Sequence, residues 1–165
     1  MSSRQVVLTL PADPAATEVL GCRLGRHLRP GDTVALSGSL GAGKTTLVRG
    51  LAVGLEVDDP DAVASPTYLL VVEHPGPVPL LHADAYLPQK LEGFLADGGL
   101  EYLFDAAHVV AVEWADRIPN QLPERTLWIE IGLSPDGGRR VVLRTGAKPP
   151  AFSWLEDLPT MSTGR

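Results

Sequence analysis

The chain has 165 residues, a length typical of one folded domain, and its 44% hydrophobic content excludes disorder as the main state. The net charge of −6 argues against a self-sufficient nucleic-acid binder, because such proteins need a basic surface to meet phosphates. The longest apolar run, Tyr68 to Val72, is far shorter than the roughly 20 residues that span a bilayer. We therefore expect a soluble, cytoplasmic protein with no membrane association.

The first half of the chain alternates predicted strands and helices. Gln5–Leu10 is expected to be a strand, and Asp13–Leu28 a helix with leucines at every fourth position of its second half. Thr33–Ser37 is expected to be a short buried strand, and a glycine-rich loop follows it. Beyond that loop, the leucine spacing of Leu47–Leu55 predicts a second helix.

The next segment is expected to be richer in strands. Tyr68–Glu73 and Val78–Asp84 are predicted strands joined by a tight loop that contains two prolines and a glycine. Leu91–Leu103 has a weak helical pattern that a glycine pair interrupts. His108–Trp114 is again β-branched and apolar, which predicts another buried strand.

The end of the chain is expected to close the sheet. Arg125–Gly132 and Arg139–Thr145 are predicted to form an antiparallel hairpin around an Asp-Gly-Gly turn. Buried strands separated by helices favour the α/β class, and the hairpins indicate antiparallel additions to a mainly parallel sheet flanked by helices. We expect one domain over residues 1–148, followed by a C-terminal tail over 149–165 that is partly packed or flexible.

One motif carries the strongest chemical signal. Residues 38–45 match the pattern G-x-x-x-x-G-K-[ST] completely and lie between a predicted strand and a predicted helix. The glycines let backbone N–H groups turn toward phosphate oxygens, and the start of the helix adds its dipole. Lys44 suits the β and γ phosphates, and the Thr45 hydroxyl suits Mg²⁺. The sequence therefore predicts a P-loop NTPase-like fold with a nucleotide site. The residues expected to bind the nucleotide are Gly38, Ser39, Leu40, Gly41, Ala42, Gly43, Lys44, Thr45 and Thr46.

Two acidic residues end predicted buried strands. Asp84 follows Leu80–Ala83, and Glu113 follows Val109–Val112. Because the carboxyl ends of parallel strands line the ligand crevice of an open sheet, both acids are expected near the phosphates. One can hold Mg²⁺ and the other can orient an attacking water, and the pattern leaves that assignment open. Thr67, which follows a proline, offers a further hydroxyl to Mg²⁺ or to the γ-phosphate.

Three classes of P-loop protein compete: a GTPase switch, a phosphotransferase, and an ATPase that drives or regulates a partner. The sequence contains no D-x-x-G and no N/T-K-x-D motif, so guanine specificity has no support. A small-molecule kinase usually carries several Arg or Lys beyond its loop. Only Lys90 lies between Gly50 and Asp116, which argues against a kinase acting on a small molecule but keeps it as the alternative.

Four short motifs follow one another along the chain. They are Leu40–Thr46, Ser65–Tyr68, His82–Tyr86 and Glu113–Trp114. In this order they resemble the bacterial TsaE family, formerly called YjeE, over roughly Val6 to Thr145. The resemblance implies an ATPase required for threonylcarbamoyladenosine formation at position 37 of tRNA. It also implies ATP and Mg²⁺ as cofactors, TsaD and TsaB as partners, and contact with tRNA only through their complex.

The resemblance also implies roles for single residues. Lys44 and Thr45 bind phosphate and Mg²⁺, while Asp84 serves the metal site. Thr67 belongs to a switch-like segment, and Glu113 is similar to the family's catalytic acid. The expected catalytic residues are Glu113, Thr67 and Lys44. The expected metal ligands are Thr45, Asp84 and Glu113, and Trp114 joins the residues expected at the nucleotide.

Two positions depart from the family pattern. The acidic residue usual in the loop is Ser39 here, and the arginine usual after the tyrosine of the third motif is Leu87. Among the basic residues, Arg117 is the candidate internal cation, whereas Arg49 is expected to face away from the phosphates. Because cations stabilise the transition state of phosphoryl transfer, we expect slow hydrolysis by this chain alone and faster hydrolysis with its partners.

Overall fold

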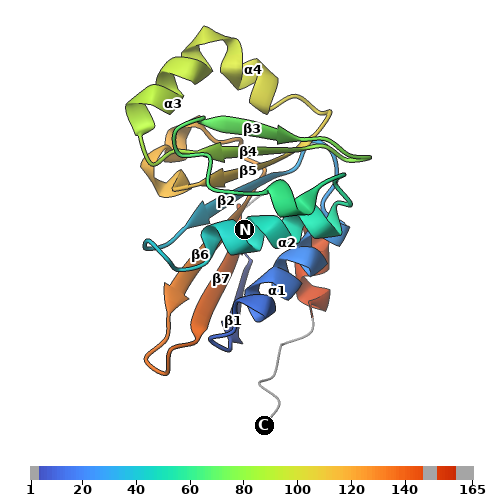
Figure 1. Cartoon of the computed structure of the whole chain (residues 1–165), viewed down its shortest axis with the longest axis vertical. Coiled ribbons are helices and arrows are strands. Elements are labelled where there is room, and N and C mark those ends of the chain that lie inside the picture. The colour runs from blue at the N-terminus through green and yellow to red at the C-terminus, as the bar shows by residue number, and fades with distance from the viewer. Residues whose placement is uncertain (1–3, 147–151, 159–165) are drawn as a thin grey trace.

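The computed structural model of the protein describes residues 4–146 and 152–158. Seven strands form one sheet. They are β1 (Gln5–Leu10), β2 (Thr33–Ser37), β3 (Val71–His74), β4 (Leu80–Asp84), β5 (Val109–Glu113), β6 (Thr126–Leu133) and β7 (Arg139–Thr145). The α-helices are α1 (Pro14–His27), α2 (Lys44–Gly54), α3 (Pro88–Phe94) and α4 (Leu100–Leu103). Figure 1 shows α1 and α2 side by side along the sheet, with α3 and α4 at the opposite end of the molecule.

The sheet has a parallel centre and antiparallel edges. Its strand order is β1-β7-β6-β2-β5-β4-β3. Strands β6, β2, β5 and β4 are parallel, whereas β7, β1 and β3 each run antiparallel to their neighbours. This confirms the predicted α/β class with antiparallel additions. Asp84 and Glu113 are register partners at the ends of β4 and β5, so the parallel pairing brings both acids to one edge of the sheet.

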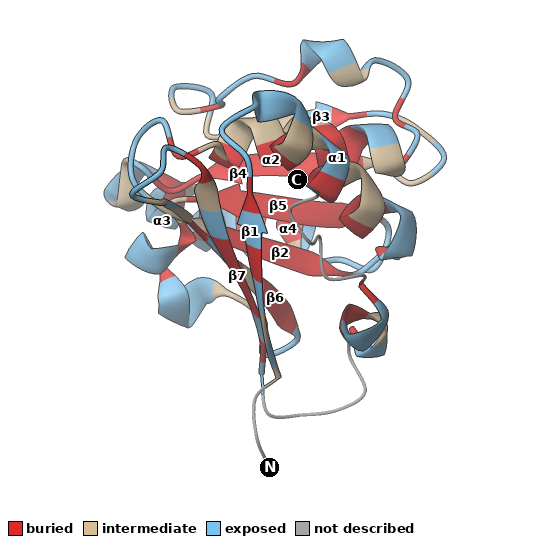
Figure 2. Ribbon diagram, turned by 90° about the horizontal axis from the view of Figure 1, so that it is seen from below, coloured by how far each residue is buried: buried red, intermediate tan, exposed pale blue. Residues whose placement is uncertain are grey.

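The sheet separates two hydrophobic cores. Successive residues of a strand point to opposite faces, so Val34 and Leu36 of β2 join the core under α1 and α2, while Ala35 joins the core under α3. The central strands are therefore buried on both faces, as Figure 2 shows by their red ribbons. This explains why their sequences are continuous apolar runs rather than alternating ones.

Helices α1 and α2 are in backbone contact. A Cβ on Gly50 would lie 2.2 Å from the Glu18 carbonyl oxygen, and a Cβ on Gly54 would lie 2.2 Å from that of Cys22. Larger residues at these two positions would therefore push the helices apart. The contact fixes α2, which begins directly after the glycine-rich loop.

Several predicted elements differ in their bounds by one to three residues, and two of these differences have a clear local cause. The strand expected to begin at Tyr68 begins at Val71, because Leu70 has a left-handed φ of 64° and its N–H bonds the Pro66 carbonyl in a turn. The helical region expected from Leu91 already begins at Pro88, since proline suits the first helical position. As predicted, a glycine interrupts this region, in a π-type turn over Leu95–Gly99.

The C-terminal segment folds back on the domain. Residues Ser153–Asp157 form a 3₁₀ turn, and Phe152, Leu155 and Leu158 are buried in the core beneath α1 and α2. The predicted boundary between domain and tail, at 148–149, lies outside the described residues. Within the described ranges, no helix is both long and apolar enough to cross a bilayer.

Candidate functional site

The glycine-rich loop joins the end of β2 to the start of α2. Gly43 has a left-handed φ of 113° and caps α2, whose first residue is Lys44. Gly38 leaves no room for a side chain, since a Cβ there would lie 2.3 Å from the Ile131 carbonyl oxygen. The loop therefore lies against β6 at Gly38 and leads into the N-terminus of α2, where helical N–H groups have no partner within the helix.

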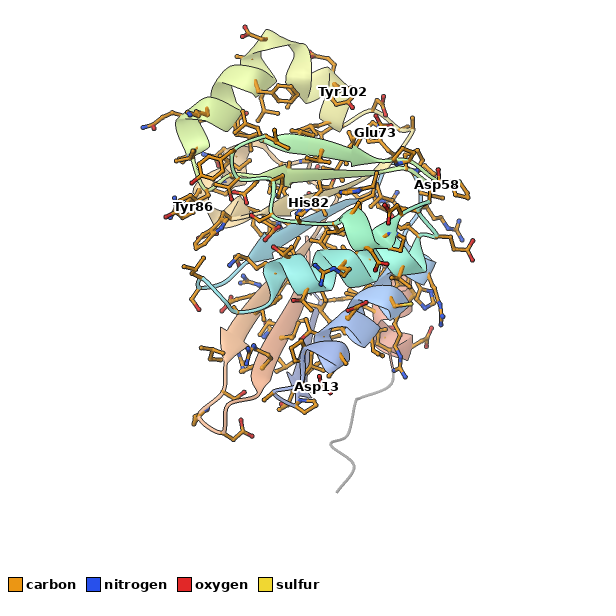
Figure 3. The ribbon with its side chains drawn as sticks, viewed as in Figure 1. Asp13, Asp58, Glu73, His82, Tyr86 and Tyr102 are labelled. Atoms are coloured by element: carbon orange, nitrogen blue, oxygen red, sulfur yellow. The ribbon has the colours of Figure 1, made fainter. Side chains whose placement is uncertain are left out.

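A pocket of about 440 Å³ opens above this loop. It is lined by Leu40, Gly41, Gly43, Lys44, Thr45, Thr46, Ser65, Thr67, Tyr86, Glu113 and Trp114. Four segments therefore meet there: the loop with the start of α2, the 65–67 segment, and the ends of β4 and β5. Figure 3 shows Tyr86 at this edge of the sheet and His82 farther inside the molecule, within β4.

Lys44 is anchored by its own loop. Its Nζ donates hydrogen bonds to the carbonyl oxygens of Gly38 at 2.7 Å and Ser39 at 2.9 Å, and lies 4.1 Å from the centre of the Trp114 ring. Burial lowers the pKa of its amine below the usual value, and nearby carboxylates, Glu113 first, offset part of that shift. The amine is thus held at the pocket by hydrogen bonds to two main-chain carbonyls of its own loop.

Glu113 links the loop helix to β4. Its carboxylate accepts hydrogen bonds from the Thr45 hydroxyl at 2.9 and 3.1 Å and from His82 Nε2 at 2.5 Å. A carboxylate can only accept, so Nε2 carries the proton of the histidine bond. Both Glu113 and His82 are buried. His82 Nδ1 and His74 Nε2 have no hydrogen-bond partner within the described part of the chain.

Asp84 is tied to the 65–67 segment. Its Oδ2 accepts from the Thr67 hydroxyl at 3.2 Å and from Ser65 Oγ at 3.4 Å, while its Oδ1 accepts from the Tyr86 N–H at 2.7 Å. Burial raises the pKa of the Asp84 carboxyl above its usual value, and the neighbouring Glu113 raises it further. The two hydrogen bonds from Tyr86 and Thr67 oppose that shift.

Trp114 adopts a left-handed backbone conformation, with φ 57°, directly after β5. Such a conformation is unfavourable for a bulky residue, and here it places the ring against Lys44. The Arg117 guanidinium lies 4.8 Å from the centre of the Trp114 ring and 4.7 Å from the centre of the Tyr86 ring. It also donates a hydrogen bond to the Tyr86 carbonyl. Arg117 is not among the residues that line the pocket. Arg49 is not among the lining residues either, and its guanidinium donates to the Val63 carbonyl.

One further basic residue, which the sequence did not predict to be near the site, contacts the glycine-rich loop. Arg139, at the start of β7, donates from Nε to the Ala42 carbonyl at 2.9 Å and from Nη1 to the carbonyls of Gly137 and Gly138 at 3.0 and 3.2 Å. It thereby connects the loop to the β6–β7 turn. No motif marks it, because it lies 97 positions after Ala42 and meets the loop only through the sheet.

The structure brings most predicted site residues to this pocket. Lys44, Thr45, Thr67, Glu113 and Trp114 line it, with Leu40, Gly41, Gly43 and Thr46 from the loop. Four other predicted residues do not line the pocket: Gly38, Ser39, Ala42 and Asp84. The carbonyls of Gly38 and Ser39 accept from Lys44, Asp84 accepts from Thr67, and Ala42 lies within the loop.

The oxygen donors at the pocket suit a metal held jointly with phosphate. Among the described residues, no group of three or more His, Cys, Asp and Glu side chains has the arrangement of a metal site. Mg²⁺ usually takes one or two carboxylates together with phosphate oxygens and water. Thr45, Asp84 and Glu113 offer that limited donor set near Lys44, so the residues present fit a magnesium nucleotide.

Comparison with known proteins gives a consistent family match. The model of the family described as "Threonylcarbamoyl adenosine biosynthesis protein TsaE" matches residues 11–141. Proteins described as "tRNA threonylcarbamoyladenosine biosynthesis protein TsaE" are similar to this chain. The one from Streptomyces coelicolor is 43% identical over 123 residues, which cover 68% of this chain and 76% of that protein. The one from Treponema pallidum is 37% identical over 123 residues, which cover 74% of this chain and 89% of that protein.

A solved structure supports the same match. The crystal structure of YdiB from Bacillus subtilis superposes with a TM-score of 0.75 at 28% sequence identity. The superposition covers 96% of each chain, so the similarity extends over the whole fold and includes the edge of the sheet that carries the pocket.

Proposed function

The chain belongs to the TsaE family, and on that premise we propose that it binds and hydrolyses ATP in support of tRNA threonylcarbamoyladenosine biosynthesis. The observation that carries the proposal is the pocket in which Lys44, Thr45 and Glu113 meet. These three side chains offer a cation, a hydroxyl and a carboxylate, the groups that a site for phosphoryl transfer to water needs.

The loop residues bind the phosphates. Lys44 exchanges its hydrogen bonds to the carbonyls of Gly38 and Ser39 for bonds to phosphate oxygens, because a bond between two charged groups is stronger than one to a neutral carbonyl. The N–H groups at the start of α2 point toward the same anion. Mg²⁺, when bound, neutralises charge on the phosphates. Thr45 and Asp84 hold it through their oxygens.

Glu113 acts on the attacking water. Its two hydrogen-bonding partners, Thr45 and His82, fix the carboxylate at the end of β5. A fixed carboxylate orients a water molecule and accepts its proton as the water oxygen bonds to the γ-phosphorus and the bond from that phosphorus to the departing ADP oxygen breaks. His82 is a positioning residue in this scheme, because it touches Glu113 rather than the substrate. Thr67 holds Asp84 and presents its hydroxyl to the pocket.

Exposed apolar side chains at the mouth of the pocket support an interaction with protein partners, which the family resemblance identifies as TsaD and TsaB. Leu40 is 85% exposed, Tyr68 90% and Leu69 74%, and all three lie on the loop and turn that border the pocket. Large apolar side chains exposed together favour a protein contact. The only cation among the described lining residues is Lys44, so a partner that adds or orders a cation would accelerate hydrolysis.

Calorimetric titration tests the nucleotide assignment. ATP with Mg²⁺ should bind the purified protein more tightly than GTP does, and Lys44→Ala should weaken ATP binding. Lys90→Ala removes the same charge from α3, outside the lining, and should leave binding unchanged. Unchanged ATP affinity in folded Lys44→Ala protein would contradict the site. A phosphorylated small molecule, formed by this protein alone and detected by mass spectrometry, would replace the ATPase proposal with a kinase.

A further inference from the structure

A second pocket, of about 420 Å³, lies at the other end of the sheet from the glycine-rich loop. Asp32 directly precedes β2 and Gly38 directly follows it, so the length of this five-residue strand, roughly 17 Å, separates the two pockets. The lining comes from the end of α1, the approaches to β2 and β6, and the C-terminal turn. It includes Arg26, His27, Arg29, Asp32, Arg125 and Trp154.

The lining is positively charged. Three arginines against one aspartate give it a formal charge of +2, whereas the whole chain carries −6. The buried Asp32 carboxylate is already engaged, because its Oδ1 accepts from the Arg125 guanidinium at 3.1 Å and its Oδ2 from the Arg29 N–H at 2.8 Å. The exposed guanidinium groups of Arg26 and Arg29 bond no group within the described residues. Their donors are therefore available to a ligand.

Aromatic rings form a wall beside these arginines. The rings of His27 and Trp154 stack with their centroids 4.9 Å apart at an angle of 14°, and Phe152 meets the Trp154 ring edge-on at 6.0 Å. Figure 1 shows this C-terminal turn, in red, beside the end of α1. Because Phe152 is buried in the core, the wall is fixed to the domain and gives the pocket a defined shape.

We propose that this second pocket binds a phosphate-bearing anion. Guanidinium groups match phosphate oxygens with two parallel hydrogen bonds and stay charged at all physiological pH values. Arg26 and Arg29 supply the free donors, and Arg125 adds charge while holding Asp32 in place. A free phosphate compound and the backbone of an RNA share this chemistry. The proposal does not depend on ATP binding at the glycine-rich loop.

The test uses full-length Lys44→Ala protein, in which the first pocket is weakened, and inorganic pyrophosphate as the probe. The indole N–H resonance of Trp154, identified with Trp154→Phe, should shift saturably. The Arg26→Gln/Arg29→Gln variant should weaken this binding roughly tenfold or more, because it removes two charge-assisted donors. Arg125 is kept, since its removal would leave a buried carboxylate without its partner. Arg23→Gln, on the same helix but outside the lining, is the matched control and should bind as the parent does.

A short RNA stem-loop distinguishes the two sources of phosphate. Displacement of pyrophosphate by the RNA, with the same loss in the double arginine variant, identifies an RNA backbone as a ligand. If pyrophosphate binds saturably and the RNA does not displace it, the ligand of this pocket is a free phosphate compound. Absence of any Trp154 shift at millimolar pyrophosphate, or equal affinities in the double variant and the parent, would overturn the proposal.

Discussion

Thr45 and Glu113 lie 68 positions apart in the chain, yet the Thr45 hydroxyl donates to the Glu113 carboxylate at 2.9 Å. The bond joins the first turn of α2 to the last residue of β5. His82, on the neighbouring strand, donates from Nε2 to Oε2 of the same carboxylate at 2.5 Å. The fold thus holds this carboxylate, which lines the pocket, through partners on two different elements, and the proposed water-orienting role requires such a fixed position.

Glu113→Gln should reduce ATP hydrolysis by about 10²-fold or more while ATP binding persists. Glutamine keeps the shape of the side chain but accepts no proton from water, and general-base catalysis typically contributes at least that factor. Turnover and calorimetric affinity are measured on the same preparation. Glu92→Gln, on the exposed face of α3, is the control. Parental turnover of Glu113→Gln in the presence of partners would contradict the role.

Asp84→Asn should lower hydrolysis and also weaken the Mg²⁺-dependent part of nucleotide binding. The substitution keeps the hydrogen bond from the Tyr86 N–H but removes the charge that a metal needs. Titrations of ATP with Mg²⁺ and with EDTA measure the difference. Asp61→Asn changes an exposed acid elsewhere and should behave as the parent. An unchanged Mg²⁺ dependence in Asp84→Asn would remove Asp84 from the metal site.

Thr45→Ala should impair Mg²⁺-dependent hydrolysis more than ATP binding, whereas Lys44→Ala should act mainly on binding. In the proposed site the Thr45 hydroxyl binds the metal, and the Lys44 amine neutralises phosphate charge. Thr45→Ser retains the hydroxyl and should restore most of the activity lost in Thr45→Ala. If Thr45→Ser were as inactive as Thr45→Ala, the methyl group rather than the hydroxyl would be the important feature.

Arg139→Gln should raise KM for ATP roughly tenfold, with a smaller effect on kcat. In a trans peptide the C=O and the following N–H point in opposite directions. The Arg139 bond to the Ala42 carbonyl therefore keeps the Gly43 N–H turned the other way, toward the pocket that Gly43 lines. Loss of a charge-assisted bond of this kind costs about a factor of ten. Arg140→Gln alters the next residue of β7, which is exposed, and should leave KM unchanged. If the KM of Arg139→Gln equalled that of the parent protein, the loop would hold its shape without this arginine.

The features that the sequence predicts well are local or periodic. The loop pattern places Lys44 and Thr45 at the start of a helix, and the apolar runs before Asp84 and Glu113 place both acids at strand ends. For His82 the local pattern favours a hydrogen-bonded core residue and gives it no role, although it lies directly beside Glu113. Its contact depends on the pairing of β4 with β5, which no local pattern contains.

The features that the sequence misses arise from contacts between distant segments. Arg139 reaches Ala42 only because β7 pairs beside β6 and carries its first residue to the loop. The sequence marks Gly50 only as a residue within a helix, and its need to be glycine appears only in the contact between α2 and α1. The turn at Leu70 overrides a strong strand propensity, since the chain must bend there to bring Thr67 to Asp84.

Steady-state phosphate release, measured for this chain alone and again with the proposed partners TsaD and TsaB, tests the central proposal most directly. Glu113→Gln protein carried through both arms corrects for contaminating ATPases. Because Lys44 is the only cation among the described residues that line the pocket, we predict slow release by the chain alone and a clear stimulation by the partners. Rapid release by the chain alone, on the order of the 10 s⁻¹ typical of enzymes, with no further increase on adding the partners, would contradict it.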